Sequence, residues 1–224
     1  MKEKNNLMIW IMLIVLLLLA ISIIFIWYKE NKNESLLENK LTKQQKVKII
    51  SENSPLTSYV YLTKNATFPR QNKIKKITIH HMAADLSLEE VGKLFSIKER
   101  KTSANYAIDK EGKIGLYVEE KNRAWTSSSP ENDHQAITIE VANDEIGGNW
   151  HISDKSYNAL INLCIDICKR NKIKKLNYTG DKKGNVTLHK MFKKNTECPG
   201  PYLESKIKDI VKKVNKELDN VKNY

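Results

Sequence analysis

The stretch KKITIHH, Lys75–His81, carries the clearest secondary-structure signal in this chain of 224 residues. Its polar and apolar residues alternate and it is rich in isoleucine and threonine, which is typical of a β-strand. Alternation places His81 on the face of the two isoleucines and His80 on the opposite face, with Thr78. Because isoleucines point into a core, we expect His80 to face a cleft and His81 to be packed, unless a bulge at the strand end exchanges them.

Helix and strand patterns alternate after this strand. The segment 86–99, LSLEEVGKLFSIKE, predicts a helix, because Ser87 and Glu90 have the spacing of a capping box. The later patterns predict two strands within 104–118, a strand at 134–143, a helix at 153–170 and a closing amphipathic helix at 202–221. Strands interleaved with helices predict an α/β or α+β domain.

The chain begins with an apolar run, Leu7–Trp27, of 21 residues without a charge. As a helix it would be ~31 Å long, enough to cross the hydrocarbon core of a bilayer and longer than the apolar core of a cleavable signal peptide. We therefore expect residues 1–28 to form an uncleaved transmembrane anchor; the alternative is cleavage at Ala20–Ser22. Because short N-terminal tails usually stay inside, we expect a single-pass cell-membrane protein whose large domain is extracytoplasmic.

The rest of the chain divides into a polar segment and one domain. Residues 29–55 are lysine-rich and lack a sustained apolar face, which indicates a stalk. Residues 56–224 have a usual length for one domain with its own core and contain no internal repeat. We expect the protein to be a monomer.

The chain beyond the apolar run is strongly basic. Residues 28–224 contain 36 Lys and Arg against 25 Asp and Glu, because only Lys2, Glu3 and Lys4 of the charged residues precede them. Such a charge suits a polyanionic neighbour. For a membrane-anchored domain, anionic wall polymer or phospholipid headgroups fit better than nucleic acid. The alternative is that most of these lysines are simply solvated.

Two of the three cysteines have a packing explanation. Cys164 and Cys168 lie on the apolar stripe of the predicted helix 153–170, where a thiol behaves as a small apolar residue. Their four-residue helical spacing holds the pair poorly for a disulfide. Cys198 is left without a covalent partner, and a lone thiol outside the cytoplasm indicates a chemical role.

A zinc site would be such a role. The segment TLHKMFKKNTECPGPYL, 187–203, places His189 nine residues before Cys198. A catalytic zinc takes three protein ligands and keeps a position open for water. His80, at the end of the predicted strand, is the best source of the third ligand. Each histidine alone is more often structural, so the combination carries the prediction.

Five motifs within about residues 74–210 occur together. They are the strand ending ITIHH, the hairpin SANYAIDKEGKIGLYV, RAW at Arg123–Trp125, the strand AITIEVAN, and LH followed by CPGPYL. Together they resemble the zinc-dependent N-acetylmuramoyl-L-alanine amidases of the type-2 group, which includes phage amidase endolysins and peptidoglycan recognition proteins.

This resemblance implies a fold, a metal and a reaction. The fold is α/β, with a mixed central β-sheet flanked by helices and a Zn²⁺ ion in a groove on one sheet face. The implied zinc ligands are His80, His189 and Cys198. The implied substrate is peptidoglycan, cleaved at the amide between the lactyl group of N-acetylmuramic acid and the L-alanine of the stem peptide. Zinc in such a site activates water and polarises the carbonyl group.

Two residues are candidates for catalysis beside the metal. Glu140 matches a glutamate that acts as general base and acid in one branch of the family; the alternative is an exposed strand carboxylate. A tyrosine and a lysine used by other members are missing, since Ala104 and Thr196 stand in their places. Thr196 instead resembles the threonine of catalytic recognition proteins, whose hydroxyl can hydrogen-bond the tetrahedral oxyanion.

Three further residues resemble groove residues for the sugar and the stem peptide. They are Asn105, Tyr106 and Trp125. The alternative is a core position, because aromatic side chains in strands more often pack inside.

Two other classes of function stay open. The first is a peptidoglycan-binding module without catalysis, tethered to the membrane. Cys198 argues against it, because recognition proteins without activity lack the cysteine ligand. The second is a structural membrane-anchored protein whose basic stalk binds anionic polymer, and hydrolysis of purified wall would exclude it.

Overall fold

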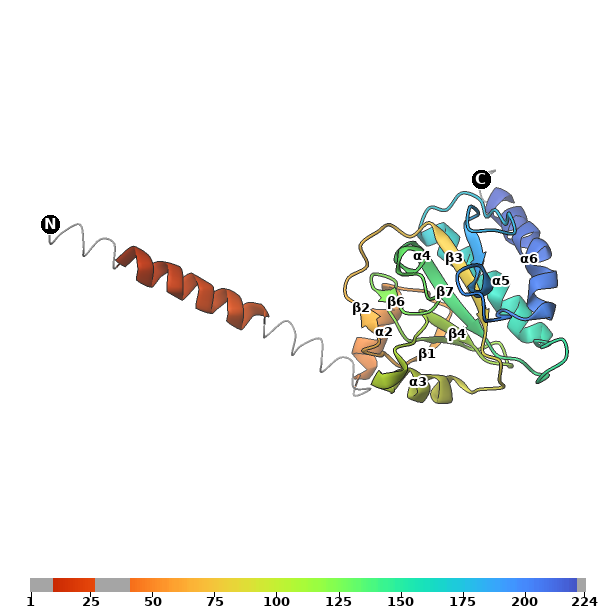
Figure 1. Cartoon of the computed structure of the whole chain (residues 1–224), viewed down its shortest axis with the longest axis horizontal. Helices are drawn as coiled ribbons and strands as arrows, with labels where there is room; N and C mark the ends of the chain where they lie inside the picture. Colours follow the sequence, from red (N-terminus) through yellow and green to blue (C-terminus); the bar gives the residue numbers. More distant parts are fainter. Residues whose placement is uncertain (1–9, 27–40, 221–224) are drawn as a thin grey trace. The chain divides into compact units, whose positions relative to one another are not determined.

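The structure is a computed structural model that describes residues 10–26 and 41–220 (Figure 1). Its contacts divide the chain into two units, 1–41 and 42–224. All of the described strands belong to the second unit.

The prediction of a transmembrane anchor is wrong. Within 10–26 and 41–220, no helix combines the length and the apolar character that crossing a membrane requires. The predicted cell-membrane location and the extracytoplasmic placement of the domain rested on that span, so both are withdrawn. Residues 7–9 and Trp27, at the ends of the predicted run, lie outside the described residues.

A six-stranded mixed sheet forms the centre of the second unit, in the order β1-β5-β4-β7-β3-β8. Within it β4 and β5 are antiparallel, and the other neighbouring strands are parallel. Its strands are β1 (Thr57–Val60), β3 (Lys76–His81), β4 (Tyr106–Ile108), β5 (Ile114–Leu116), β7 (Ala136–Val141) and β8 (Val186–Leu188). A separate antiparallel pair consists of β2 (Ala66–Thr67) and β6 (Arg123–Ala124). The predicted mixed α/β architecture is confirmed.

Strand β3 lies between β7 and β8 and is buried on both faces. Ile77 and Ile79 are 0 % and 1 % exposed, and Thr78 on the other face is also 0 % exposed. Thr78 Oγ1 lies 2.9 Å from Thr187 Oγ1 of β8. A polar layer therefore underlies the face of β3 to which His80 belongs.

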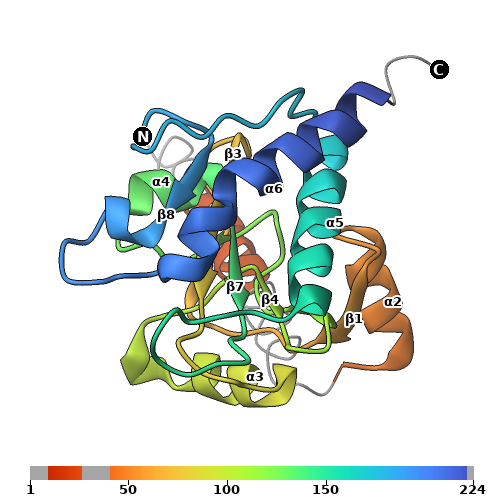
Figure 2. The ribbon, with the colours of Figure 1, turned by 90° about the vertical axis from the view of Figure 1, so that its right-hand side faces the viewer.

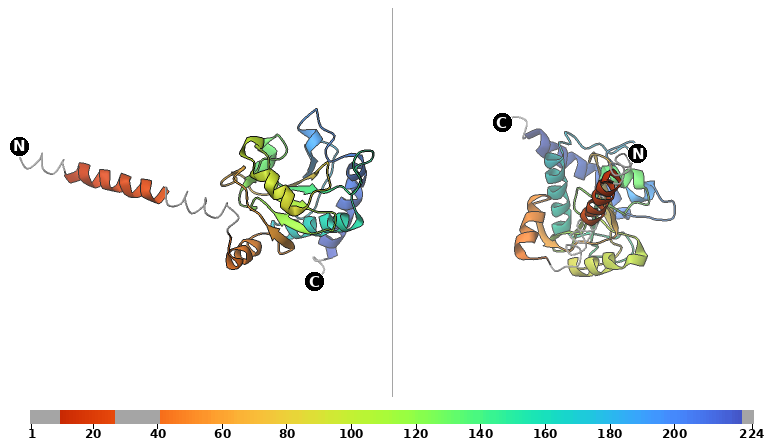
Figure 3. Two further views of the ribbon diagram at one scale, coloured as in Figure 1. Left: turned by 90° about the horizontal axis from the view of Figure 1, so that it is seen from below. Right: turned by 90° about the vertical axis from the view of Figure 1, so that its left-hand side faces the viewer.

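Helices cover both faces of the sheet. They are α2 (Lys43–Ser51), α3 (Leu88–Ser96), α4 (Pro130–Gln135), α5 (Asp154–Arg170) and α6 (Pro201–Asn220), with 3-10 helices η1 (Lys98–Arg100) and η2 (His189–Met191). Helices α5 and α6 pack against each other, and α5 contacts β4 and β7 (Figure 2). Helix α3, nearest the viewer in the left view of Figure 3, packs against Ala107 of β4. Tyr106, the preceding residue of β4, donates a hydrogen bond to Glu120, which also accepts one from Arg170 of α5.

The helix predictions are confirmed because their signals are local. Ser87 caps α3 and forms the capping box with Glu90, and Ser153 caps α5. Cys164 and Cys168 are both 0 % exposed and free, as the packing explanation predicts. The inward stripe of α6 consists of Leu203, Ile207, Ile210, Val214 and Leu218.

The predicted boundary between a stalk at 29–55 and a domain at 56–224 stays a prediction. Residues 27–40 lie outside the described residues. The described part of the predicted stalk contains α2, whose Ile49 is buried. Asn53, which follows α2, accepts a hydrogen bond from Glu120 N at 2.7 Å.

Candidate metal centre

Three side chains from separate parts of the chain meet at one edge of the sheet. His80 lies near the end of β3, His189 directly follows β8, and Cys198 precedes α6. Because β3 and β8 are parallel neighbours, their carboxyl ends meet at the same edge and bring the two histidines together. Potential ligand atoms of the three side chains all lie within 4.8 Å of one another.

The three side chains are close and largely shielded from solvent. Cys198 Sγ lies 3.5 Å from His80 Nδ1, and the ring centroids of His80 and His189 are 4.9 Å apart. His80 and Cys198 are 0 % and 7 % exposed, and His189 is half-buried. Lys190 N donates a hydrogen bond to Cys198 O at 3.1 Å, which fixes the chain after His189 against the cysteine.

Burial controls the protonation of these groups. It lowers the pKa of His80 well below its usual value, with a further contribution from nearby His189. It also lowers the pKa of His189. Both imidazoles are therefore neutral at pH 7, the form that binds a metal. Burial, together with nearby Glu140, raises the pKa of the Cys198 thiol, and a bound dication would oppose this by stabilising the thiolate.

The donor set fits a zinc ion. Two imidazoles and one thiolate are ligands that zinc accepts, whereas magnesium and calcium prefer oxygen. Within the described residues, buried Nε2 atoms of His80 and His189 and Oε2 of Glu140 have no hydrogen-bond partner. Because buried polar atoms are normally paired, these unpaired atoms indicate that a polar group or a metal ion binds at this edge of the sheet.

Glu140 lies beside the cluster on β7. It is the register partner of His80 in the parallel pairing of β3 and β7, and its Oε1 lies 3.9 Å from His80 Nδ1. The Glu140 side chain is 19 % exposed, and burial raises its pKa to about 8. A carboxyl group near the metal ligands with a pKa near neutrality can both accept and donate a proton.

Thr196 lies two residues before Cys198 and is half-buried. Its Oγ1 accepts a hydrogen bond from Cys198 N at 3.2 Å. Because the hydroxyl oxygen is the acceptor in that bond, its proton remains available for another acceptor. An oxyanion donor needs such a proton close to the metal ligands.

A family model matches the part of the sequence that carries these motifs. The family model Amidase_2, N-acetylmuramoyl-L-alanine amidase, matches residues 70–201. The chain belongs to this family. The match confirms the resemblance drawn from the five motifs. No curated protein matches the chain.

Solved structures share the fold of this member of the amidase family. PlyL has a TM-score of 0.54 and 19% identity, over 70% of this chain and 95% of PlyL. The catalytic domain of XlyA has a TM-score of 0.52 and 16% identity, over 67% of this chain and 92% of that domain. A mutant endolysin from Bacillus subtilis has a TM-score of 0.52 and 18% identity, over 69% and 99%. At these identities the likeness shows the fold.

In this amidase-family chain, His81 lies outside the ligand cluster. Its ring packs edge-on against Trp150, with centroids 5.3 Å apart at 89°. A Cβ atom on Gly200 would lie 3.1 Å from both the His81 ring and Trp150 Cβ, and Gly200 has a φ of +85°. The close packing around His81 therefore requires glycine within the CPGPYL motif, and His81 is packed as expected.

Asn105 and Tyr106 are not brought to the cluster. Both are 0 % exposed. The Asn105 side chain donates to Val118 O at 3.0 Å and accepts from Thr138 N at 3.1 Å. The Tyr106 hydroxyl donates to Glu120 Oε1 at 2.7 Å. Because these groups are buried and bonded internally, they fit the packing alternative, and we do not carry them into the proposed groove.

Trp125 is half-buried and lines a cavity of about 360 Å³. His189 lines the same cavity, which connects Trp125 to the candidate metal centre. Trp125 Nε1 donates to Thr67 Oγ1 at 2.9 Å, which holds the indole in place. The basic residues Arg100 and Lys101 also line this cavity, and the motifs did not identify them.

The loop after β7 packs beside the candidate site, against His81, and the sequence motifs did not identify it. Trp150 has a φ of +53°, which is rare for a bulky residue. Asn143 Nδ2 donates to Trp150 O at 2.7 Å, and Tyr202 N donates to Asn149 O at 3.0 Å. Strain that is held in this way is common near functional sites. The pair Gly147–Gly148 before an aromatic residue was the available sequence signal.

Proposed function

We propose that this chain is a zinc-dependent amidase that hydrolyses the bond between N-acetylmuramic acid and the L-alanine of the peptidoglycan stem peptide. Membership of the amidase family supports peptidoglycan amidase activity. The observation that carries the zinc dependence is the convergence of His80, His189 and Cys198 within 4.8 Å, beside the carboxylate of Glu140.

The two histidines and the cysteine would hold the ion. When bound, zinc supplies Lewis-acid polarisation of the amide carbonyl and lowers the pKa of a water molecule. His80 and Cys198 come from a buried strand end and a largely buried turn, so they provide a rigid and weakly hydrated ligand set. The neutral state of both imidazoles makes their lone pairs available for coordination.

Glu140 would carry the proton. Amide hydrolysis needs a base for the attacking water and an acid for the departing amine, and one carboxyl group can act in both steps. Glu140 is held on β7 opposite His80, so the carboxyl group keeps a fixed position relative to the ligands. Its partial exposure leaves access to the substrate side.

Thr196 and Trp125 would complete the site. The Thr196 hydroxyl would donate to the substrate oxygen that gains negative charge, because the bond that Thr196 Oγ1 accepts from Cys198 N leaves the hydroxyl proton free. Trp125 would contact the substrate through the cavity that it shares with His189. An indole offers a broad apolar face for a sugar ring or a peptide methyl group.

Metal analysis and product analysis test this proposal together. The purified full chain should contain about one zinc ion per molecule and should release peptides with free N-terminal alanine from purified muropeptides. A strong chelator should abolish hydrolysis, and added zinc should restore it. Binding of wall without hydrolysis would favour the non-catalytic module, and hydrolysis unaffected by metal removal would exclude the metal role.

A further inference from the structure

A cleft of about 940 Å³ lies at the edge of the sheet opposite the candidate metal centre. One wall is formed by residues 72–75, immediately before β3. Another is formed by residues 170–175, which begin at the last residue of α5. His80 lies instead near the carboxyl end of β3. His80 is five positions after Lys75, which corresponds to about 16 Å in an extended chain. A ligand in the cleft would therefore leave the metal centre accessible.

Five exposed lysines line this cleft. Within residues 10–26 and 41–220, their ammonium groups have no ion-pair or hydrogen-bond partner. They are Lys73, Lys75, Lys172, Lys174 and Lys175. Two separate segments supply them, so the fold, in addition to the local sequence, concentrates the charge.

The other charged residues of the cleft are already occupied. The Arg70 guanidinium donates to five backbone carbonyl groups, including that of Glu120. Arg170 donates to both carboxylate oxygens of buried Glu120, at 2.6 and 2.7 Å. Glu52 lies 3.9 Å from Lys121. The acids that line the cleft are thus matched by other cations, and the charge of the five lysines is uncompensated.

The remaining lining narrows the chemistry of a ligand. The described residues of the cleft wall include no aromatic side chain, and the isoleucines Ile74 and Ile173 are half-buried. Single-stranded nucleic acid is usually bound with aromatic stacking, and membrane surfaces are usually bound with exposed apolar side chains. Lysines act as mobile point charges that suit phosphate groups on a flexible chain.

We propose that this cleft binds a flexible phosphodiester-linked polymer of polyols or sugars. Its repeating phosphates would pair with lysines on both walls. Such a polymer has no bases that need aromatic stacking and no acyl chains that need an apolar surface, which agrees with the lining of the cleft. Such binding would hold the protein on an anionic matrix by a surface that is separate from the metal centre. The proposed binding does not depend on catalysis, so it can be tested separately from hydrolysis.

The test measures binding of the full chain to immobilised poly(glycerol phosphate). The wild type should bind, and binding should weaken as salt rises through about 0.1 M because exposed charges are screened. Replacing Lys172, Lys174 and Lys175 together by Gln should weaken binding by about tenfold or more. Replacing Lys73 and Lys75 by Gln, on the other wall, should also weaken it.

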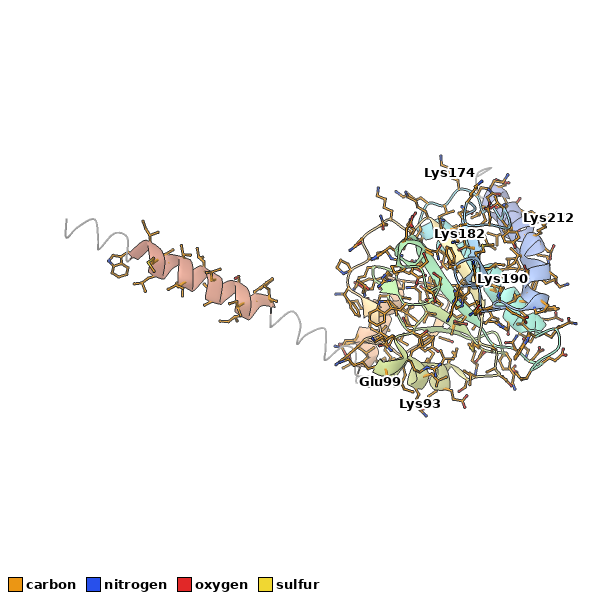
Figure 4. All side chains as sticks on the ribbon, viewed as in Figure 1. Lys93, Glu99, Lys174, Lys182, Lys190 and Lys212 are labelled. Atoms are coloured by element: carbon orange, nitrogen blue, oxygen red, sulfur yellow. The ribbon has the colours of Figure 1, made fainter. Side chains whose placement is uncertain are left out.

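The matched control removes three exposed lysines elsewhere, Lys93, Lys98 and Lys113, also by replacement with Gln. Figure 4 shows Lys93 and Lys174 at opposite ends of the second unit. The control has the same net charge as the first variant and the same apolar N-terminal segment, so the difference between them reports the cleft. Thermal unfolding of both variants verifies that they are folded.

Three results would overturn the proposal. One is absence of binding by the wild type. Another is equal weakening in the two triple variants, which would mean general charge attraction. The third is tighter binding to phosphatidylglycerol vesicles or to a thymidine oligonucleotide than to poly(glycerol phosphate), provided that this binding is lost in the cleft variant and kept in the control. That result would assign the cleft to a lipid surface or to a nucleic acid. Hydrolysis of muropeptides is measured separately, so failure of the amidase proposal remains distinguishable.

Discussion

His80 and Glu140 are register partners on the parallel strands β3 and β7, with Nδ1 and Oε1 3.9 Å apart. One is a candidate zinc ligand and the other the candidate proton carrier. Their separation is set by the hydrogen-bonded centre of a sheet, where backbone movement is small. His189 and Cys198, by contrast, lie in segments that follow β8 and precede α6.

Replacing His80 by Ala should remove zinc from the protein, whereas replacing His81 by Ala should leave zinc content close to that of the wild type. His80 contacts Cys198, and His81 packs against Trp150. Metal analysis of the purified full-length variants checks this. Loss of zinc from the His81 variant alone would show that the ligand assignment is reversed.

Replacing Glu140 by Gln should lower the catalytic constant by about two to four orders of magnitude, the usual contribution of general acid and base catalysis. Gln keeps the size of the side chain and removes its ability to exchange a proton. Zinc content and binding of uncleaved muropeptide should change little, because the loss lies in the transition state. Activity above roughly a tenth of the wild-type value would assign proton transfer to another group.

Replacing Thr196 by Val should lower the catalytic constant by about a hundredfold or more, because an oxyanion donor would be lost. Val retains the branched shape but has no hydroxyl group. Ser retains the hydroxyl that accepts from Cys198 N, so the Ser variant serves as the control and should keep most of the activity. Steady-state kinetics with zinc-loaded protein measures both. Equal rates for the Val variant and the wild type would exclude the role.

Replacing Glu120 by Ala should destabilise the fold by about 3–5 kcal/mol, the usual cost of removing one partner from a buried ion pair. Glu120 is 5 % exposed, and it accepts hydrogen bonds from Arg170 and from the Tyr106 hydroxyl. Denaturant unfolding measures the change. The control is Glu111→Ala, which breaks an exposed pair with Lys155 and should leave the unfolding midpoint almost unchanged. Similar midpoints for the two variants would contradict the prediction.

The helices α3, α5 and α6 and the central strand β3 could be predicted from the sequence because their signals are local. The Ser87–Glu90 capping box and the apolar stripe of α6 depend on residues within a few positions of one another. The alternation in KKITIHH likewise predicted β3 to within one residue. The apolar run at the N-terminus predicted a transmembrane anchor, and this prediction was wrong, because no helix within residues 10–26 and 41–220 combines the length and the apolar character that a span requires.

The candidate site could be predicted only in part from the sequence. The chemistry of His80, His189 and Cys198 singled them out as potential ligands, and resemblance to the family grouped them. The burial of Asn105 and Tyr106 could not be predicted from the sequence, because the exposure of a strand residue depends on which helices cover the sheet. The position of Trp150 beside His81 also depends on a loop conformation that has no simple sequence pattern.

By itself, the sequence determined the central strand β3, the helices α3, α5 and α6, the basic charge and the candidate zinc ligands. The tertiary structure alone decided that His80 meets Cys198, 118 positions away, and that lysines of two distant segments share one cleft. The physical reason is range. Backbone preferences and amphipathic periodicity act over a few residues, whereas distances between functional groups arise from strand order and register in the packed sheet.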